Sequence, residues 1–385
     1  MLNLDRQSWR RGAQNSLRLP AFACMHGHFR DDPEITAIVA RHASEGFEIN
    51  LLEPNLDPPV TTGALAKEYE RRVREHFMPL GHGDHRLIMT IYLTERTTAA
   101  DIETAHELGV NVAKLYYKVT TNSAHGVSHW REAETAIAKA AELCERYPAR
   151  PMYVQVHAEA LGHDFPEREA ACIAHMEELV ATYPNLWLAI EHVSTRAMLE
   201  FVARHPRVGA SITLHHLLCT WDDDCVHEGC LDGHRFCAPV PKTEDDRRAL
   251  LDAAFERVPA LVGKIWLGLD FAPHPLETKD GDWDWPPKDG KLPRMGMYTL
   301  DVAVPLLVAL FERYGSGNWQ AELIRFAATN GPDWYRIARP TRTIQVVREG
   351  WQVPDFYPAS DGRPLLRSFI AGQFVDWRIV PNRDY

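Results

Sequence analysis

The chain of 385 residues contains no run of about 18 apolar residues, the length that a membrane-spanning helix requires. Its first residues, MLNLDRQSWRRGAQ, also lack the apolar core that is typical of a secretory signal peptide. Both absences argue against a membrane protein and against secretion. We therefore expect the protein to stay in the cytoplasm.

A surplus of positive charge is absent as well. The 42 lysine and arginine residues are outnumbered by 53 aspartate and glutamate residues, so the formal net charge is -11. These acidic residues are spread along the chain, whereas a protein that binds a phosphate backbone needs a basic surface. We therefore expect no nucleic-acid partner.

Cysteines are few and odd in number, seven between Cys24 and Cys237. Such scattered cysteines in a long chain are not typical of a secreted disulfide framework, which indicates reduced thiols. One stretch, 219–237, gathers several soft side chains: Cys219, Cys225, His227, Cys230, His234 and Cys237. Their spacings do not match paired C-x2-C knuckles, so we interpret the stretch as a loop with incidental side chains. A structural zinc site is the alternative.

What the sequence does contain is a regular alternation of strand and helix patterns. Eight short apolar runs predict strands at 22–28, 48–53, 87–93, 110–116, 152–157, 187–192, 208–214 and 264–270. Segments with helical spacing accompany them at 33–45, 64–77, 98–108, 131–147, 166–183, 195–204, 244–257 and 298–314. Parallel strands need crossover helices, so this order predicts an α/β fold, the (β/α)8 TIM barrel. An open, doubly wound sheet is the alternative.

The chain shows no internal repeat and no low-complexity linker, so we expect a single domain over residues 1–385. After residue 340 the pattern changes to short alternating segments. They predict a few extra strands in an appended C-terminal segment, 340–385. Residues 277–294 are rich in Pro, Gly and Asp and predict a long loop on the active-site face.

Polar residues that can bind a metal stand at or near the ends of the predicted strands. In an extended strand His26 and His28 would project to the same side, because alternate side chains do. His28, Lys114, His157, His192 and Asp270 lie at or near the carboxyl ends of separate strands, where such barrels build their active sites. Each histidine alone has an ordinary structural explanation. Together, the imidazoles and the carboxylate favour a zinc centre.

Lys114 is the candidate for a bridge between two metal ions. Its unmodified ammonium group would repel cations, and a lysine that extends out of the barrel mouth is the simpler interpretation. Carboxylation by CO2 would instead turn the side chain into a bridging carboxylate. Two-metal sites need such a bridge, since their ions lie about 3.5 to 4 Å apart.

The motifs around these residues resemble those of dihydroorotases of the shorter bacterial class, in the amidohydrolase superfamily. HGHFR fits H-x-H-x-R, EPNLDPPVTT fits M-P-N-L-x-P-P-V-T-T, and AKLYYKVTTNSAHGV fits A-K-L-Y followed by T-T-N-S-x-H-G-V. VHAE, IEHVST, LHHLL and GLDFAPH match V-H-G-E, E-H-x-T-T, Q-H-L and G-T-D-S-A-P-H in the same order. The similarity covers most of residues 22 to 335, and the ordered set is far more specific than any single motif.

The resemblance implies a dihydroorotase, which reversibly hydrolyses (S)-dihydroorotate to N-carbamoyl-L-aspartate in de novo pyrimidine biosynthesis. It implies that two zinc ions activate a water and polarise the ring amide. His26, His28 and Asp270 would hold one ion, His157 and His192 the other, and carboxylated Lys114 would bridge them. Asp270 would also be the catalytic residue that moves a proton to the leaving ring nitrogen. The family likeness further implies a homodimer.

The resemblance also implies a set of substrate-binding residues: Arg30, Asn55, Thr120, Thr121, Ala238 and His274. Arg30, Asn55 and His274 would hold the substrate carboxylate. The two threonines belong to a segment that resembles a mobile loop and is one residue shorter here. Ala238 stands where a leucine contacts the substrate through its backbone.

Some positions depart from the resembled motifs. Leu269 and Phe271 replace small polar residues beside Asp270, and the 277–294 loop is unlike its counterpart. We expect these changes to affect specificity and not metal binding. Two alternatives therefore stay open: a binuclear zinc hydrolase of another small cyclic amide or imide, and a non-catalytic dihydroorotase-like partner of an aspartate transcarbamoylase. The presence of all six candidate ligands argues against the second.

Overall fold

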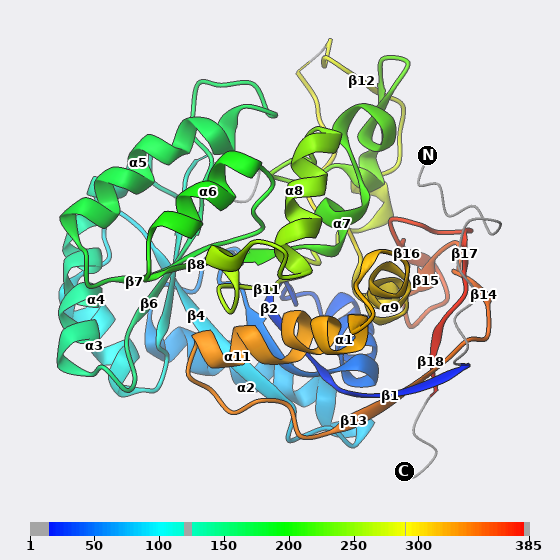
Figure 1. The fold of residues 1–385 in the computed structure, drawn as a ribbon, viewed down its shortest axis with the longest axis horizontal. Helices are drawn as coiled ribbons and strands as arrows, with labels where there is room; N and C mark the ends of the chain where they lie inside the picture. Colours follow the sequence, from blue (N-terminus) through cyan, green and yellow to red (C-terminus); the bar gives the residue numbers. More distant parts are fainter. Residues whose placement is uncertain (1–14, 119–124, 289, 381–385) are drawn as a thin grey trace.

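A computed structural model of the chain describes residues 15–118, 125–288 and 290–380 (Figure 1). Its centre is a sheet of eight strands in the order β11-β8-β7-β6-β5-β4-β3-β2. All neighbouring pairs are parallel. The strands are β2 (Phe22–Gly27), β3 (Phe47–Leu52), β4 (Arg86–Leu93), β5 (Val112–Tyr116), β6 (Tyr153–His157), β7 (Trp187–Ile190), β8 (Val208–Ile212) and β11 (Ile265–Leu267). Each predicted strand run overlaps one of them.

The sheet curls until its two edge strands meet. Just past β11, the backbone N–H of Asp270 donates to the carbonyl of His26 at 2.9 Å, and that of His28 donates to the carbonyl of Phe271 at 3.0 Å. Gly268 permits this approach, because a Cβ there would lie 2.9 Å from the Cβ of His26. The barrel is therefore nearly closed, which confirms the predicted (β/α)8 fold and excludes the open sheet.

Helices cover the outside of the barrel between successive strands (Figure 1). They are α1 (Pro33–Gly46), α2 (Gly63–Phe77), α3 (Ala99–Glu107), α4 (Glu134–Arg146), α5 (Arg168–Thr182), α6 (Arg196–Arg204), α8 (Glu244–Ala254) and α9 (Ala303–Tyr314). Capping side chains fix where several of these helices begin. Asp32 accepts from two backbone N–H groups of α1, and Thr98 forms a capping box with Asp101 at α3. None of the helices in the described ranges is long and apolar enough to cross a membrane.

The amino-terminal half of the barrel interior is filled by apolar and aromatic side chains. This inner cluster consists of Ala23, Met25, Ile49, Leu51, Val112, Tyr153, Ala189, Trp266, Trp334 and Tyr335. Its last two members come from the end of the helical segment α10 (Trp319–Ile324) to α11 (Asn330–Trp334). Tyr153 fastens them by donating its hydroxyl to the carbonyl of Trp334 at 2.8 Å. This packing leaves the carboxyl ends of the strands as the place for a site.

The chain ends add small antiparallel sheets beside the barrel. β1 (Ser16–Pro20) pairs with β13 (Thr343–Val347), which pairs with β18 (Arg378–Val380). Two further pairs are β14 (Trp351–Gln352) with β17 (Phe374–Val375), and β15 (Tyr357–Pro358) with β16 (Pro364–Leu366). These strands gather on one side of the molecule (Figure 1).

The Cys/His-rich stretch folds together with the long loop. β9 (Val226–His227) and β10 (Cys230–Leu231) form a three-stranded sheet with β12 (Trp283–Asp284), within the predicted loop 277–294. Cys230 is exposed, whereas Cys219, Cys225 and Cys237 are buried. Within the described ranges, no three of the six residues proposed for a structural zinc come together as a ligand group. The structure therefore does not support that alternative.

Candidate active site

A cavity of about 40 Å³ lies at the carboxyl ends of the barrel strands. Five of the six predicted metal ligands line it: His26, His28, His157, His192 and Asp270. Lys114, the sixth, projects from β5 and is fully buried. Its Nζ lies 5.1 Å from the ring centre of Tyr116, which also lines the cavity. Residues from five different strands or strand ends therefore meet at one place.

Three of these residues form a compact group that could hold one cation. Asp270 Oδ1 lies 2.9 Å from His28 Nε2 and 3.3 Å from His26 Nε2. Their ligand atoms all lie within 4.8 Å of one another, and all three side chains are buried. The two histidines come from the end of β2, where the pairing with β3 shifts register between Cys24 and Gly27. Two imidazoles and a carboxylate suit zinc.

The other two histidines lie beside this group. The ring of His192 is 4.6 Å from that of His157 and 5.1 Å from that of His26, centre to centre. His157 Nε2 donates to Glu159 Oε2 at 2.6 Å. Nδ1 of His192 is buried and has no hydrogen-bond partner among the described residues. A buried ring nitrogen without a partner is costly, and a metal ion at this position would satisfy it.

The backbone is strained at three positions of this region. Left-handed φ values are uncommon for residues with a Cβ, because of steric strain. Arg30 (φ 65°), His192 (φ 43°) and Asp270 (φ 45°) all adopt them. All three are predicted site residues. Such strain persists only where the surrounding structure holds it, and it is found preferentially at functional sites.

Sequence reasoning missed the carboxylates behind the histidines. Glu191 Oε2 accepts from His26 Nδ1 at 2.7 Å and from the Ser211 hydroxyl at 2.6 Å. Glu53 Oε2 accepts from the Tyr116 hydroxyl at 2.7 Å and lies 3.3 Å from Lys114 Nζ. A carboxylate that receives the second N–H of a histidine orients that ring for a metal. The available signals were Glu191 directly before His192, and Glu53 in place of the methionine of the resembled motif.

Burial and neighbouring charges shift the pKa values of these side chains. Burial lowers the pKa of His26, but the negative charges of Glu53 and Asp270 outweigh burial and raise it to about 9. Burial would raise the pKa of Asp270, but His26 and His28 hold it well below its usual range. Burial keeps the pKa of His192 well below its usual value, so this ring is neutral, as a ligand must be.

Comparison with known proteins identifies the family. No family model matches the chain. The dihydroorotase of Delftia acidovorans is 33% identical over 360 residues, which cover 92% of this chain and 95% of that protein. This chain belongs to the dihydroorotase family. The prediction made from the sequence motifs is thereby confirmed.

Solved structures of dihydroorotases and hydantoinases share the barrel. The crystal structure of the Campylobacter jejuni dihydroorotase has a TM-score of 0.80 at 24% identity, and the match covers 96% of this chain and 98% of that chain. The L-hydantoinase of Arthrobacter aurescens has a TM-score of 0.71 at 16% identity, over 95% and 83% of the two chains. At these identities the likeness shows the fold, which agrees with the family assignment.

On the substrate side of this dihydroorotase-family site, the predicted residues lie around the same cavity. Arg30, Asn55 and Ala238 line it. Nδ1 of His28 donates to Oδ1 of Asn55 at 2.7 Å, so Asn55 also fixes a candidate metal ligand. His274 lies next to Arg30, with Nε2 at 3.0 Å from Arg30 Nη2. Thr120 and Thr121 fall outside the described residues.

The two residues beside Asp270 that depart from the resembled motif face the core. Leu269 and Phe271 are both fully buried, and neither lines the cavity. Phe271 packs edge-on against Phe29 at 5.5 Å and covers Gly27, where any Cβ would lie 2.2 Å from its ring. By contrast, Met295 and Gly296, which directly follow the long loop 277–294, do line the cavity. Leu269 and Phe271 therefore act on packing, away from the place where substrate would bind.

Proposed function

We propose that this member of the dihydroorotase family is a dihydroorotase, which reversibly hydrolyses (S)-dihydroorotate to N-carbamoyl-L-aspartate in de novo pyrimidine biosynthesis. The observation that carries the proposal is the meeting of four histidines and Asp270 around one cavity that Arg30 also lines. A relative named dihydroorotase, matched over 92% of this chain, supports the same substrate.

The cofactors in this proposal are two Zn²⁺ ions. His26, His28 and Asp270 would hold one ion, and His157 and His192 the other, with carboxylated Lys114 as the bridge. The compact first group and the unpartnered Nδ1 of His192, judged within the described residues, fit such ions. When bound, two zinc ions would polarise the ring amide and supply an activated water. Glu53 and Glu191 would orient His26 from behind.

The side chains then have separate tasks. Asp270 accepts a proton from the attacking water and passes it to the departing ring nitrogen, and the reverse transfer closes the ring. Arg30 pairs with the substrate carboxylate, where a guanidinium can donate two parallel hydrogen bonds. Asn55 and His274 support this pairing, Thr120 and Thr121 donate hydroxyls, and the backbone of Ala238 contacts the ring. In this proposal the protein is a cytoplasmic homodimer that acts on a small molecule and needs neither nucleic acid nor membrane.

A turnover assay with quantified metal content tests the proposal. Purified protein loaded with zinc is expected to hydrolyse dihydroorotate with a kcat/KM at least about 10²-fold above that for an uncharged hydantoin or succinimide, because the latter leave Arg30 without its anionic partner. Arg30→Met should keep its zinc and lose about 10²-fold in kcat/KM for dihydroorotate alone, since a hydrogen bond to a charged group is removed. Lys114→Ala should lose most of its zinc.

Three outcomes would contradict this proposal. Faster turnover of the uncharged rings would favour a hydrolase of another cyclic amide or imide. Protein that binds no zinc after purification without chelator would favour a non-catalytic partner of an aspartate transcarbamoylase. Full zinc occupancy in Lys114→Ala would refute the bridging role.

A further inference from the structure

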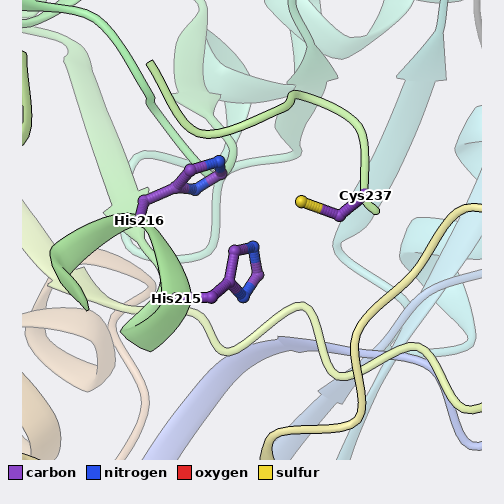
Figure 2. A group of neighbouring side chains, drawn as sticks. All are labelled: His215, His216 and Cys237. Atoms are coloured by element: carbon purple, nitrogen blue, oxygen red, sulfur yellow. The ribbon is translucent and has the colours of Figure 1, made fainter. Parts of the chain in front are cut away.

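A second group of ligand-type side chains lies outside the proposed zinc centre. His215 and His216 belong to the short helix α7 (Leu214–Leu218), directly after β8, and Cys237 belongs to the segment that leads to Ala238. Their ligand atoms lie within 4.8 Å of one another, and all three side chains are at most 1% exposed. Figure 2 shows both imidazoles projecting from α7 toward the space that the Cys237 sulfur faces. The proposed reaction uses none of them.

His215 is the least satisfied of the three. Among the described residues, neither of its ring nitrogens has a hydrogen-bond partner, although the side chain is 0% exposed. A neutral imidazole carries one donor and one acceptor, and burial without partners costs free energy for both. Burial lowers the pKa of His215 to about 4, so the ring is neutral and has a free lone pair. This ring is therefore in the state that binds a metal.

His216 has the arrangement that ligating histidines usually show. Its Nε2 donates to the carbonyl of Pro239 at 3.0 Å, and its Nδ1 lies 2.8 Å from the hydroxyl of Thr213. A metal-binding histidine commonly donates its second N–H to a backbone carbonyl, which fixes the tautomer. Nδ1 then carries the lone pair, and a cation would bind there in place of the hydrogen bond from Thr213, whose side chain would turn away.

Cys237 shares this backbone carbonyl with His216. Its Sγ donates to Pro239 at 3.1 Å, so two donors share one acceptor. Burial raises the pKa of Cys237 well above its usual value, and the thiol therefore stays protonated without a metal. On binding, a divalent cation forms a bond to the sulfur, and the thiol proton leaves to solvent. The carbonyl of Pro239 is then left to His216 alone.

We propose that His215, His216 and Cys237 form a further metal site, separate from the zinc centre at the barrel mouth, which takes a borderline cation such as Zn²⁺. Two imidazoles and a thiolate are preferred ligands of such ions. Because Cys237 precedes Ala238, which lines the active-site cavity, the ion fixes that wall from behind. Its task is to hold the wall, and it takes no part in the reaction.

Cobalt substitution gives a spectroscopic signal that cannot come from the proposed zinc centre at the mouth. None of the proposed ligands at the mouth carries sulfur, so an intense near-ultraviolet charge-transfer band from thiolate to Co²⁺ reports only on a cysteine ligand. Metal-free protein is titrated with Co²⁺ while absorption and metal per chain are measured. The wild type is expected to show the band and to bind one more ion per chain than Cys237→Ser and His215→Gln.

Cys144→Ser is the matched control. Cys144 is also buried and donates its thiol to a backbone carbonyl, that of Met152 at 3.0 Å, but it lies in α4 away from any candidate ligand group of the described residues. This variant should keep both the band and the extra ion.

A folded wild type saturated with Co²⁺ that shows no band, or a band that persists in Cys237→Ser, would overturn the proposal. If Cys237→Ser does not fold, His215→Gln decides by ion count alone. Dihydroorotate turnover, measured separately, tests the proposed function independently.

Discussion

Two buried histidines at opposite ends of the barrel have pKa values shifted in opposite directions. At the mouth, burial lowers the pKa of His26, but Glu53 and Asp270 outweigh burial and raise it to about 9. At the amino end, burial lowers the pKa of His85, just before β4, to about 3. His85 stacks on Phe77 at 4.2 Å and donates from Nε2 to Asn50 at 2.7 Å. Carboxylates outweigh burial at the mouth, whereas burial and neighbouring basic groups such as Arg342 act on His85 at the amino end.

The same contrast holds for packing. The amino end is closed by aromatic rings such as Trp266 and Trp334, whose centres lie 5.3 Å apart. The mouth instead buries ionisable side chains, among them Asp270 and His192. We infer that packing at the amino end stabilises the fold and offsets the cost of burying ionisable groups at the mouth. Substitutions at the mouth should therefore change activity and zinc content, whereas substitutions at the amino end should change the free energy of unfolding.

The largest effect is expected at the mouth, from Asp270→Asn. The amide keeps the shape of the side chain but cannot accept the proton, and it is a weaker ligand. We expect kcat to fall about 10⁴-fold, together with lower zinc content. Steady-state kinetics and elemental analysis measure both. A variant with full activity would remove Asp270 from the site, and a collapse of thermal stability would break the contrast between the two ends.

Trp266→Ala probes the amino end. The ring is fully buried, and it fills the space above Gly209, where a Cβ would lie 2.5 Å from it. Its removal leaves a cavity that should cost about 3 to 5 kcal/mol of unfolding free energy. Zinc per chain should stay the same. Urea unfolding with metal analysis tests this expectation, with Trp266→Phe as the milder control. Loss of zinc at unchanged stability would contradict it.

The smallest effect concerns acid stability and His85. The unfolded chain binds a proton at this histidine near pH 6.5, whereas the folded chain does so only near pH 3. Stability is therefore lost as the pH falls below about 6.5, by up to about 1.4 kcal/mol per pH unit. His85→Gln can keep a hydrogen bond to Asn50 and has no such proton to bind. Its unfolding free energy should fall less steeply between about pH 6 and pH 4 than that of the wild type. Parallel slopes would show that His85 does not contribute.

Periodicity predicted the barrel because strand and helix patterns are local properties. The eight apolar runs and the histidines that follow them could be found from neighbouring residues alone. The inner cluster at the amino end could not be predicted in this way, since Trp334 and Tyr335 reach Trp266 only through the tertiary fold. The division into a barrel and an appended segment 340–385 stays a prediction.

The site shows the same limit. Motifs predicted the residues around the cavity, but they gave Glu53 no role, because a single departure in a motif does not reveal what the side chain touches. Its contact with Lys114 depends on how β3 and β5 are placed, at 3.3 Å between Oε2 and Nζ. Likewise, the Cys/His-rich stretch 219–237 could be interpreted only from the spacing of its residues along the chain. The group that does assemble takes two histidines from outside that stretch.

The pairing of β1 with β13 has a consequence for biosynthesis. Residues 16 to 20 find their partner strand only at residues 343 to 347, so this early strand cannot pair until translation has passed residue 343. Until then Leu17 and Leu19, which end up buried, stay uncovered in the nascent chain. A ribosome that stalls just before residue 343 would release a barrel in which β1 has no partner strand and Leu17 and Leu19 are uncovered, a substrate for chaperones or proteases.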